Sequence, residues 1–134
     1  MTTVVADANL FLRFLTNDVP FQARRSAERF KDAEKGKLRL ILFHFVLIEI
    51  LFQLENWYKL TRREAGNKLT EILSFEWIEI ENKSFVVEAL TAYPQTKIDF
   101  VDILLYTLAK GENHQILSFD KDFDTFTAKM RIEP

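Results

Sequence analysis

Cysteine is absent from the 134-residue sequence, and glycine, proline and histidine are scarce, with three, three and two copies. Without cysteine the chain can form neither a disulfide framework nor a thiolate metal site. This is compatible with the reducing cytoplasm, where we expect the protein. Three glycines provide no glycine-rich phosphate-binding loop. His44 and His114 do not form a pair at metal-ligand spacing, so we interpret both as structural.

Long apolar runs and a strong charge of one sign are also absent. The most apolar stretch, residues 38–54, is interrupted by Arg39, His44, Glu49 and Gln53, so we expect no membrane span of about 20 apolar residues. The N-terminus lacks the basic start and apolar run of a secretion signal. Because 18 basic and 20 acidic side chains give a formal net charge of -2, a polyanion would have to be held by a local basic rim or by bound cations.

Apolar residues, in contrast, are plentiful: they make up 48% of the chain and include thirteen phenylalanines. A chain of this length corresponds to one domain, since domains run roughly 100–200 residues. No repeat, low-complexity segment or flexible linker divides it. We therefore predict a single domain over residues 1–134 with a core that needs no covalent cross-links.

Apolar periodicity predicts strands that alternate with helices. The predicted strands are Thr2–Ala6, Leu38–Leu42, Glu76–Ile80, Ile116–Phe119 and an edge strand Met130–Ile132. The predicted helices are Leu10–Leu15, Phe21–Glu34, His44–Tyr58, Thr61–Leu73 with Thr61 as its cap, Ser84–Tyr93 and Asp99–Lys110. Such alternation is typical of the α/β class, with a mostly parallel sheet of four to five strands covered on both faces.

Four acidic residues fall at the junctions of these elements. Asp7 ends the first strand, and Glu49 lies about two turns into the helix after the second strand. Asp102 lies one turn into the helix before the fourth strand, and Asp120 ends that strand. Because ligands of open parallel sheets bind beyond the carboxyl ends of the strands, we expect the four carboxylates to share one edge of the sheet.

Each acid also has an ordinary structural interpretation. Asp7 or Asn9 could cap a helix, as could Asp99, and Asp120 could open a turn. Glu49 differs, because it is surrounded in sequence by aliphatic residues. A buried carboxylate without a partner is costly, so we expect a cation beside Glu49.

Gathered carboxylates repel one another, and a divalent cation removes that penalty. All-oxygen ligands favour Mg²⁺ or Mn²⁺ over Zn²⁺. Such a site suits metal-assisted hydrolysis of a phosphate ester, because one cation activates a bound water and a second can steady the leaving oxygen. No Ser–His–acid constellation is evident, so we expect no covalent intermediate on the protein.

Four segments, in order along the chain, resemble the acidic motifs of PIN-domain proteins. They are DANLFLRFL (7–15), VLIE (46–49), DFVDILL (99–105) followed by Ala109, and LSFDKDF (117–123). The resemblance spans nearly the whole chain, and the compact length resembles that of the VapC-type toxins of toxin–antitoxin pairs.

This resemblance implies a three-layer α/β/α sandwich and a Mg²⁺- or Mn²⁺-dependent ribonuclease. It also implies a homodimer and a small antitoxin protein that blocks the active site. Carried over by position, the metal-binding and catalytic residues would be Asp7, Glu49, Asp102 and Asp120. Asn9 and Ser118 match places where small polar residues steady the metal ligands. Asp99 is a further candidate ligand, although it matches a variable position.

Basic and aromatic residues near these motifs are candidate binding groups. We expect Arg13, Lys97 and Lys121 to contact RNA phosphate, with a binding strength that falls steeply with salt. Two arginine pairs are interpreted instead as solvated helix faces: Arg24/Arg25 and Arg62/Arg63. Trp57 and Tyr58 could form a dimer or antitoxin surface or could have a buried structural role.

Two rival functions are compatible with the same acids. A phosphatase of the haloacid-dehalogenase type needs an acid two residues after its nucleophilic aspartate, where this chain has Asn9. A binding module without catalytic chemistry would have no use for the four acids, since an idle cluster of carboxylates is a liability. The sequence therefore favours the nuclease.

Overall fold

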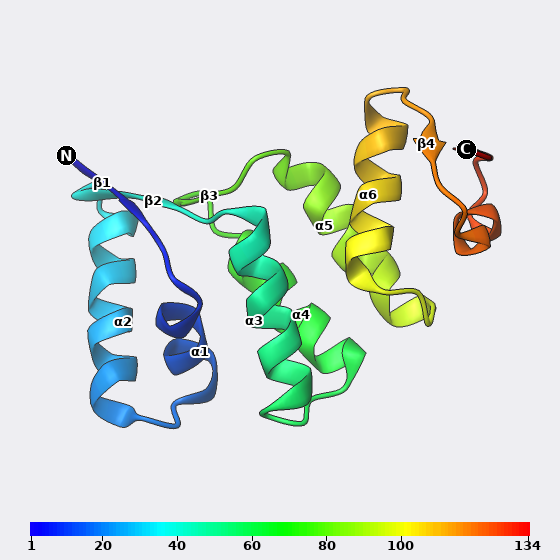
Figure 1. The fold of residues 1–134 in the computed structure, drawn as a ribbon. Helices are drawn as coiled ribbons and strands as arrows, with labels where there is room; N and C mark the ends of the chain where they lie inside the picture. Colours follow the sequence, from blue (N-terminus) through cyan, green and yellow to red (C-terminus); the bar gives the residue numbers. More distant parts are fainter. The chain divides into compact units, whose positions relative to one another are not determined.

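A computed structural model describes all 134 residues and divides the chain into two compact units, Met1–Lys83 and Ser84–Pro134 (Figure 1). Each unit has its own helices and its own small parallel sheet. None of the helices has the length and apolar character that crossing a membrane would require.

The first unit holds a three-stranded sheet with strand order β1-β2-β3. Its elements are β1 Thr2–Val5, α1 Ala8–Thr16, α2 Pro20–Glu34, β2 Leu38–Ile41, α3 His44–Asn56, α4 Arg62–Leu73 and β3 Ile78–Glu79. Both pairings are parallel, with Val4 opposite Leu40 and Leu40 opposite Ile78. Asp7 lies between the carboxyl end of β1 and the first residue of α1.

Local sequence signals set the ends of these helices. Pro20 occupies the start of α2, where its fixed φ suits the first turn. Gly36 follows α2 with φ +78°, a conformation that disfavours residues with a side chain. Thr61 and Glu64 form a capping box on α4, in which each side chain accepts a hydrogen bond from the other's backbone amide, at 3.1 and 2.9 Å.

Aromatic rings fix α1 against α2, which lie side by side in Figure 1. The ring of Phe30 on α2 lies 5.4 Å from Phe11 and 4.8 Å from Phe14, both on α1. It also lies 5.5 Å from Trp77, just before β3. Because Phe11 and Phe30 are buried, this cluster determines which face of α2 packs against α1.

The second unit holds α5 and α6 with a two-stranded parallel sheet. Its elements are α5 Lys83–Ala92, which begins at the last residue of the first unit, η1 Tyr93–Gln95, α6 Phe100–Gly111, β4 Ile116–Leu117, η2 Lys121–Thr125 and β5 Arg131–Ile132. Tyr106, Ile116 and Phe123 form its buried cluster. The ring of Phe126 stacks on Tyr106 at 3.9 Å, so the C-terminal segment packs onto α6.

Gly111 is the last residue of α6, rather than the residue after it. A Cβ atom there would lie 2.4 Å from the ring of Phe85 on α5. The Phe85 side chain therefore packs directly against the bare backbone of Gly111, and any side chain at residue 111 would have to displace this ring.

Every predicted helix and strand is present, but the strands are shorter than predicted. Short turns limit two of them: before β3 the amide of Ile78 donates to the Phe75 carbonyl and delays the start of the strand, and after β4 the amide of Asp120 donates to the Ser118 hydroxyl. Five strands form, all in parallel pairs, but they make sheets of three and two strands instead of one hydrogen-bonded sheet of four to five. The single domain over residues 1–134 stays a prediction.

Candidate functional site

Asp7 caps α1, which confirms its ordinary structural interpretation. Its Oδ1 accepts a hydrogen bond from the amide of Ala8 at 2.7 Å, while the backbone of Asp7 is still extended. The side chain is nevertheless exposed, and only one of its two oxygens is used in this contact. Asn9, the second residue of α1, is exposed and lines the same pocket as Asp7.

Glu49 is exposed, so the expectation that burial forces a cation onto it was wrong. Its aliphatic neighbours in sequence turn away from it, because each residue rotates the helix by about 100°. Leu47 and Ile50 are completely buried, whereas Phe45 and Phe52, which flank Glu49 on the exposed face of α3, are 70% and 62% exposed. Glu49 therefore lies on an open, largely aromatic helix face.

Asp102, in the second unit, has three other carboxylates as charged neighbours. It lies in the first turn of α6 and is partly buried. Burial raises the pKa of Asp102, and the carboxylates of Asp120, Asp99 and Asp122 raise it further. Asp99 occupies the N-cap position of α6, but its side chain makes no cap hydrogen bond.

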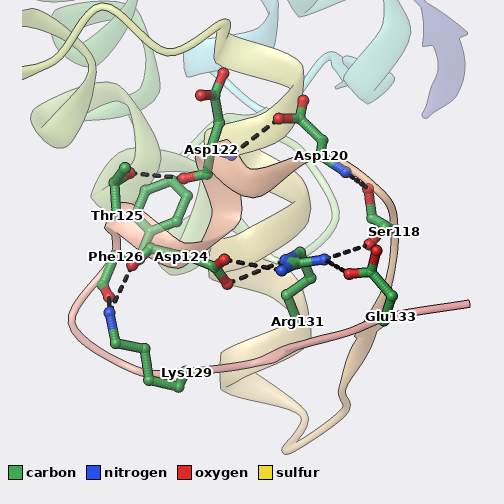
Figure 2. Close-up of polar contacts among 9 residues, drawn as sticks. All are labelled: Ser118, Asp120, Asp122, Asp124, Thr125, Phe126, Lys129, Arg131 and Glu133. Carbon is green, nitrogen blue, oxygen red and sulfur yellow. Dashed lines mark hydrogen bonds and ion pairs between the residues drawn. The ribbon is translucent and has the colours of Figure 1, made fainter.

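Asp120 follows β4 in a tight turn shown in Figure 2. Its amide donates to the hydroxyl of Ser118 at 2.9 Å, and its Oδ1 accepts from the amide of Asp122 at 2.9 Å. The predicted turn is thus present, and it fixes the direction of the Asp120 carboxylate. The hydroxyl of Ser118 thus contacts the backbone amide of Asp120.

Arg131 on β5 forms hydrogen bonds to residues on either side of this turn in the chain, Ser118 and Asp124 (Figure 2). Its Nε and Nη2 donate to the two carboxylate oxygens of Asp124 at 3.0 and 2.9 Å. Its Nη1 donates to the carbonyl of Ser118 at 3.0 Å and to the carboxylate of Glu133. The Arg131 side chain is only 12% exposed, and its hydrogen bonds lower the pKa of Asp124.

Sequence analysis missed Arg131. The available signal was an arginine between Met130 and Ile132 in the predicted edge strand, with acids nearby in sequence. An arginine at such a position needs partners if it is to pack against the sheet.

Of the predicted phosphate contacts, Arg13 is engaged in a polar network within the first unit. Its Nε donates to Gln22 at 2.8 Å, and its Nη1 donates to Asp18 at 3.2 Å and to the hydroxyl of Tyr58 at 3.1 Å. Tyr58 in turn donates to Asp18 at 2.7 Å, which lowers the pKa of that carboxyl. Tyr58 therefore has a structural role, whereas Trp57 is 74% exposed.

The predicted site residues fall into two groups, one in each unit. Asp7 and Glu49 belong to the first unit; Asp102 and Asp120 belong to the second. Lys97 and Lys121 are exposed residues of the second unit. Within neither unit do three acids or histidines lie close enough together to hold one metal ion.

In comparison with known proteins, one family model spans both units. The family model described as PIN domain matches residues 4–129, a range that includes all four acidic segments. The chain is also 28% identical, over 120 residues, to a VapC ribonuclease of Aquifex aeolicus (strain VF5), and the alignment covers 87% of each chain. The family match confirms the predicted α/β fold class, with its parallel strands and six helices. The chain belongs to the PIN domain family.

Proposed function

We propose that the protein is a divalent-metal-dependent ribonuclease that hydrolyses RNA phosphodiester bonds in the cytoplasm. The observation that carries this proposal is the surroundings of Asp102. In a chain of the PIN domain family, a partly buried carboxylate has three other carboxylates as the charged neighbours that raise its pKa. Mutual repulsion of this kind is what a bound divalent cation relieves.

The donor atoms fit Mg²⁺ or Mn²⁺, because they are all carboxylate oxygens. We assign the metal to Asp7, Glu49, Asp102 and Asp120, with Asp99 as an additional candidate. When bound, one or two such ions supply a water of lowered pKa and neutralise charge on the phosphate. The resemblance to PIN-domain nucleases implies that these four acids are ligands of the metal.

The protein's own contribution is orientation. The amide of Ala8 holds one oxygen of Asp7, and the amide of Asp122 holds one oxygen of Asp120. Each carboxylate therefore keeps a fixed direction and one oxygen for another partner. Ser118 supports Asp120 through its amide, which is the kind of contact that orients metal ligands.

Cleavage of single-stranded RNA with Mn²⁺, and its loss with a chelator, tests the proposal. Glu49→Gln and Asp102→Asn should each lower the cleavage rate at least about 100-fold, since each removes a metal ligand. Glu88→Gln, a change of an exposed acid on α5, is the matched control and should leave the rate unchanged. A metal-dependent nuclease whose rate is unaffected by Glu49→Gln would contradict the assignment. Binding of RNA without cleavage would favour the binding module.

We further propose that the protein is the toxin of a type II toxin–antitoxin pair, a homodimer whose active site is blocked by a small antitoxin protein. The similarity to a VapC ribonuclease supports this role. Exposed aromatic side chains of the first unit, Phe45, Phe52 and Trp57, are of the type enriched at protein interfaces. Sedimentation analysis of the purified protein tests the dimer. Growth arrest on expression that is relieved by Glu49→Gln tests the toxicity.

A further inference from the structure

A pocket of about 470 Å³ lies beside Asp7 within the first unit. It lies between the beginning of α1 and one face of α2. Its polar lining consists mainly of Asp7, Asn9, Arg13, Gln22, Arg25 and Arg29. Phe30, on the buried side of α2, packs against Phe11 and Phe14 of α1 and so fixes how the two helices lie beside this pocket.

The pocket concentrates positive charge in a chain that has a net charge of -2. Three guanidinium groups line it against the single carboxylate of Asp7. Arg25 and Arg29 are spaced i, i+4 on α2, so they lie on the same helix face one turn apart. Arg24 is exposed on the same helix but does not line the pocket. Arg25 therefore differs from its neighbour, although the sequence suggested that the two formed one solvated pair.

The alternative explanation is that these arginines only form surface ion pairs along α2. Arg25 lies 3.7 Å from Glu28, and Arg29 lies 3.1 Å from Asp32, both at i, i+3. The side chains of both arginines are more than half exposed, and exposed pairs of this kind contribute little and are screened by salt. A phosphate that enters the pocket can therefore compete for both guanidinium groups.

The chemistry of the lining favours a phosphate group. Guanidinium groups match phosphate oxygens with paired hydrogen bonds, and the side-chain amides of Asn9 and Gln22 add neutral donors. Arg25 also lies 5.7 Å from the centre of the Phe21 ring, a cation–π distance that keeps it beside the pocket. Because phosphate contacts fix the register of a nucleic-acid strand, a phosphate held here would place the strand relative to Asp7.

We infer that this pocket binds a phosphate group of the RNA strand next to the phosphate that is cleaved, with Arg25 and Arg29 as its main contacts. The inference rests on the proposed function, since it identifies the substrate contact of that same site. Arg13, which the sequence predicted as a phosphate contact, is the third basic residue of the pocket.

The test is binding of a fluorescein-labelled single-stranded RNA, with Ca²⁺ in place of Mg²⁺ to slow cleavage, measured by anisotropy at several salt concentrations. Arg25→Ala and Arg29→Ala should each weaken binding about 5- to 10-fold and flatten the slope of log K against log salt by about 0.7, the value for one lost contact to a single strand. Arg24→Ala, the matched control, should weaken binding less than about 2-fold and keep the slope. Thermal melting of each variant checks that it is folded.

The outcomes separate this inference from the proposed function. If the wild-type protein cleaves RNA but Arg25→Ala and Arg29→Ala bind it like Arg24→Ala, the pocket does not hold a phosphate and the ribonuclease stands. If the wild-type protein binds RNA with the expected pattern but does not cleave it, the pocket stands and the ribonuclease falls. A wild-type protein that does not bind RNA overturns the pocket. The pocket is also overturned if Arg25→Ala and Arg29→Ala leave RNA binding unchanged and weaken only the binding of an acidic protein partner.

Discussion

The two units place their acidic residues in opposite electrostatic surroundings. Asp7 in the first unit shares its pocket with three arginines, whereas Asp102 in the second unit has three carboxylates as the neighbours that raise its pKa. The nearly neutral total charge conceals this separation. On the proposed function, the acids bind a cation, and the arginines of the first unit bind a phosphate group of the RNA strand.

The largest expected effects concern stability and compare the cores of the two units. Phe30→Ala in the first unit and Phe123→Ala in the second remove buried rings, and each should cost about 3–5 kcal/mol. Urea unfolding should show whether the two changes shift one common transition or two separate ones. Phe→Leu at each position is the control and should cost clearly less. A loss below about 1 kcal/mol at either position would contradict the packing described here.

Metal should stabilise the protein by an amount that depends on the acids. At a free Mn²⁺ concentration of about 100 times its Kd, we expect about 2.7 kcal/mol of added stability. The double variant Asp7→Asn/Asp102→Asn should lose this stabilisation, as measured by thermal melting. A metal-induced shift that survives the double change would disprove the assigned ligands.

The pH dependence of the metal-free protein sharpens the same test. Because its pKa is raised in the folded state, Asp102 favours folding at low pH, and this contribution is lost as the pH rises through the raised pKa. Without metal, Asp102→Asn should therefore raise the melting temperature at neutral pH and reduce its pH dependence. Added metal should raise the melting temperature of the variant less than that of the wild type. If Asp102→Asn lowers the melting temperature in the absence of metal, the neighbouring carboxylates do not destabilise the charged form of Asp102.

A smaller effect is expected from the support of Asp120. Arg131→Ala removes the contacts to Asp124 and to the Ser118 carbonyl, so the turn that orients Asp120 should loosen. We expect cleavage to fall about tenfold, at the low end for a change behind a metal ligand, with an increased requirement for Mn²⁺. Lys110→Ala, at the exposed end of α6, is the control. An unchanged metal requirement would show that Arg131 stabilises the fold without positioning Asp120.

The smallest expected effect concerns the N-terminal cap of α4. Thr61→Ala removes the capping box of α4 and should cost about 1 kcal/mol of stability. Thr61→Ser keeps the hydroxyl and should restore most of the loss in urea unfolding. RNA cleavage at saturating metal should be the same for both variants, and a difference between them would link α4 to the site.

Local signals in the sequence predicted the fold well. The cap at Thr61 and the helix end at Glu34 depend on neighbouring residues only, and both are present. Strand lengths were overestimated, because β-branched and aromatic composition does not reveal the turn in which the amide of Ile78 bonds to Phe75. That bond holds residues 75–78 in a turn, so the strand begins only at Ile78 and has two residues.

The site was predicted less completely, for a different physical reason. Glu49 was expected to be buried because its neighbours in sequence are aliphatic, although the helical repeat turns those neighbours away from it. Arg131 and Arg25 were not identified because their surroundings come from other segments: a turn after β4 for Arg131 and the start of α1 for Arg25. Composition and spacing within one element cannot reveal such contacts.

The contact between Gly111 and Phe85 has a consequence for the acids at the other end of α6. The far end of the ring, its Cζ and Cε atoms, packs directly against the backbone of α6, so the length of the Phe85 side chain limits how close α5 and α6 come at that point. Asp99 and Asp102 lie at the N-terminal end of α6. A side chain at residue 111 would have to displace the Phe85 ring or shift the helix that carries Asp102.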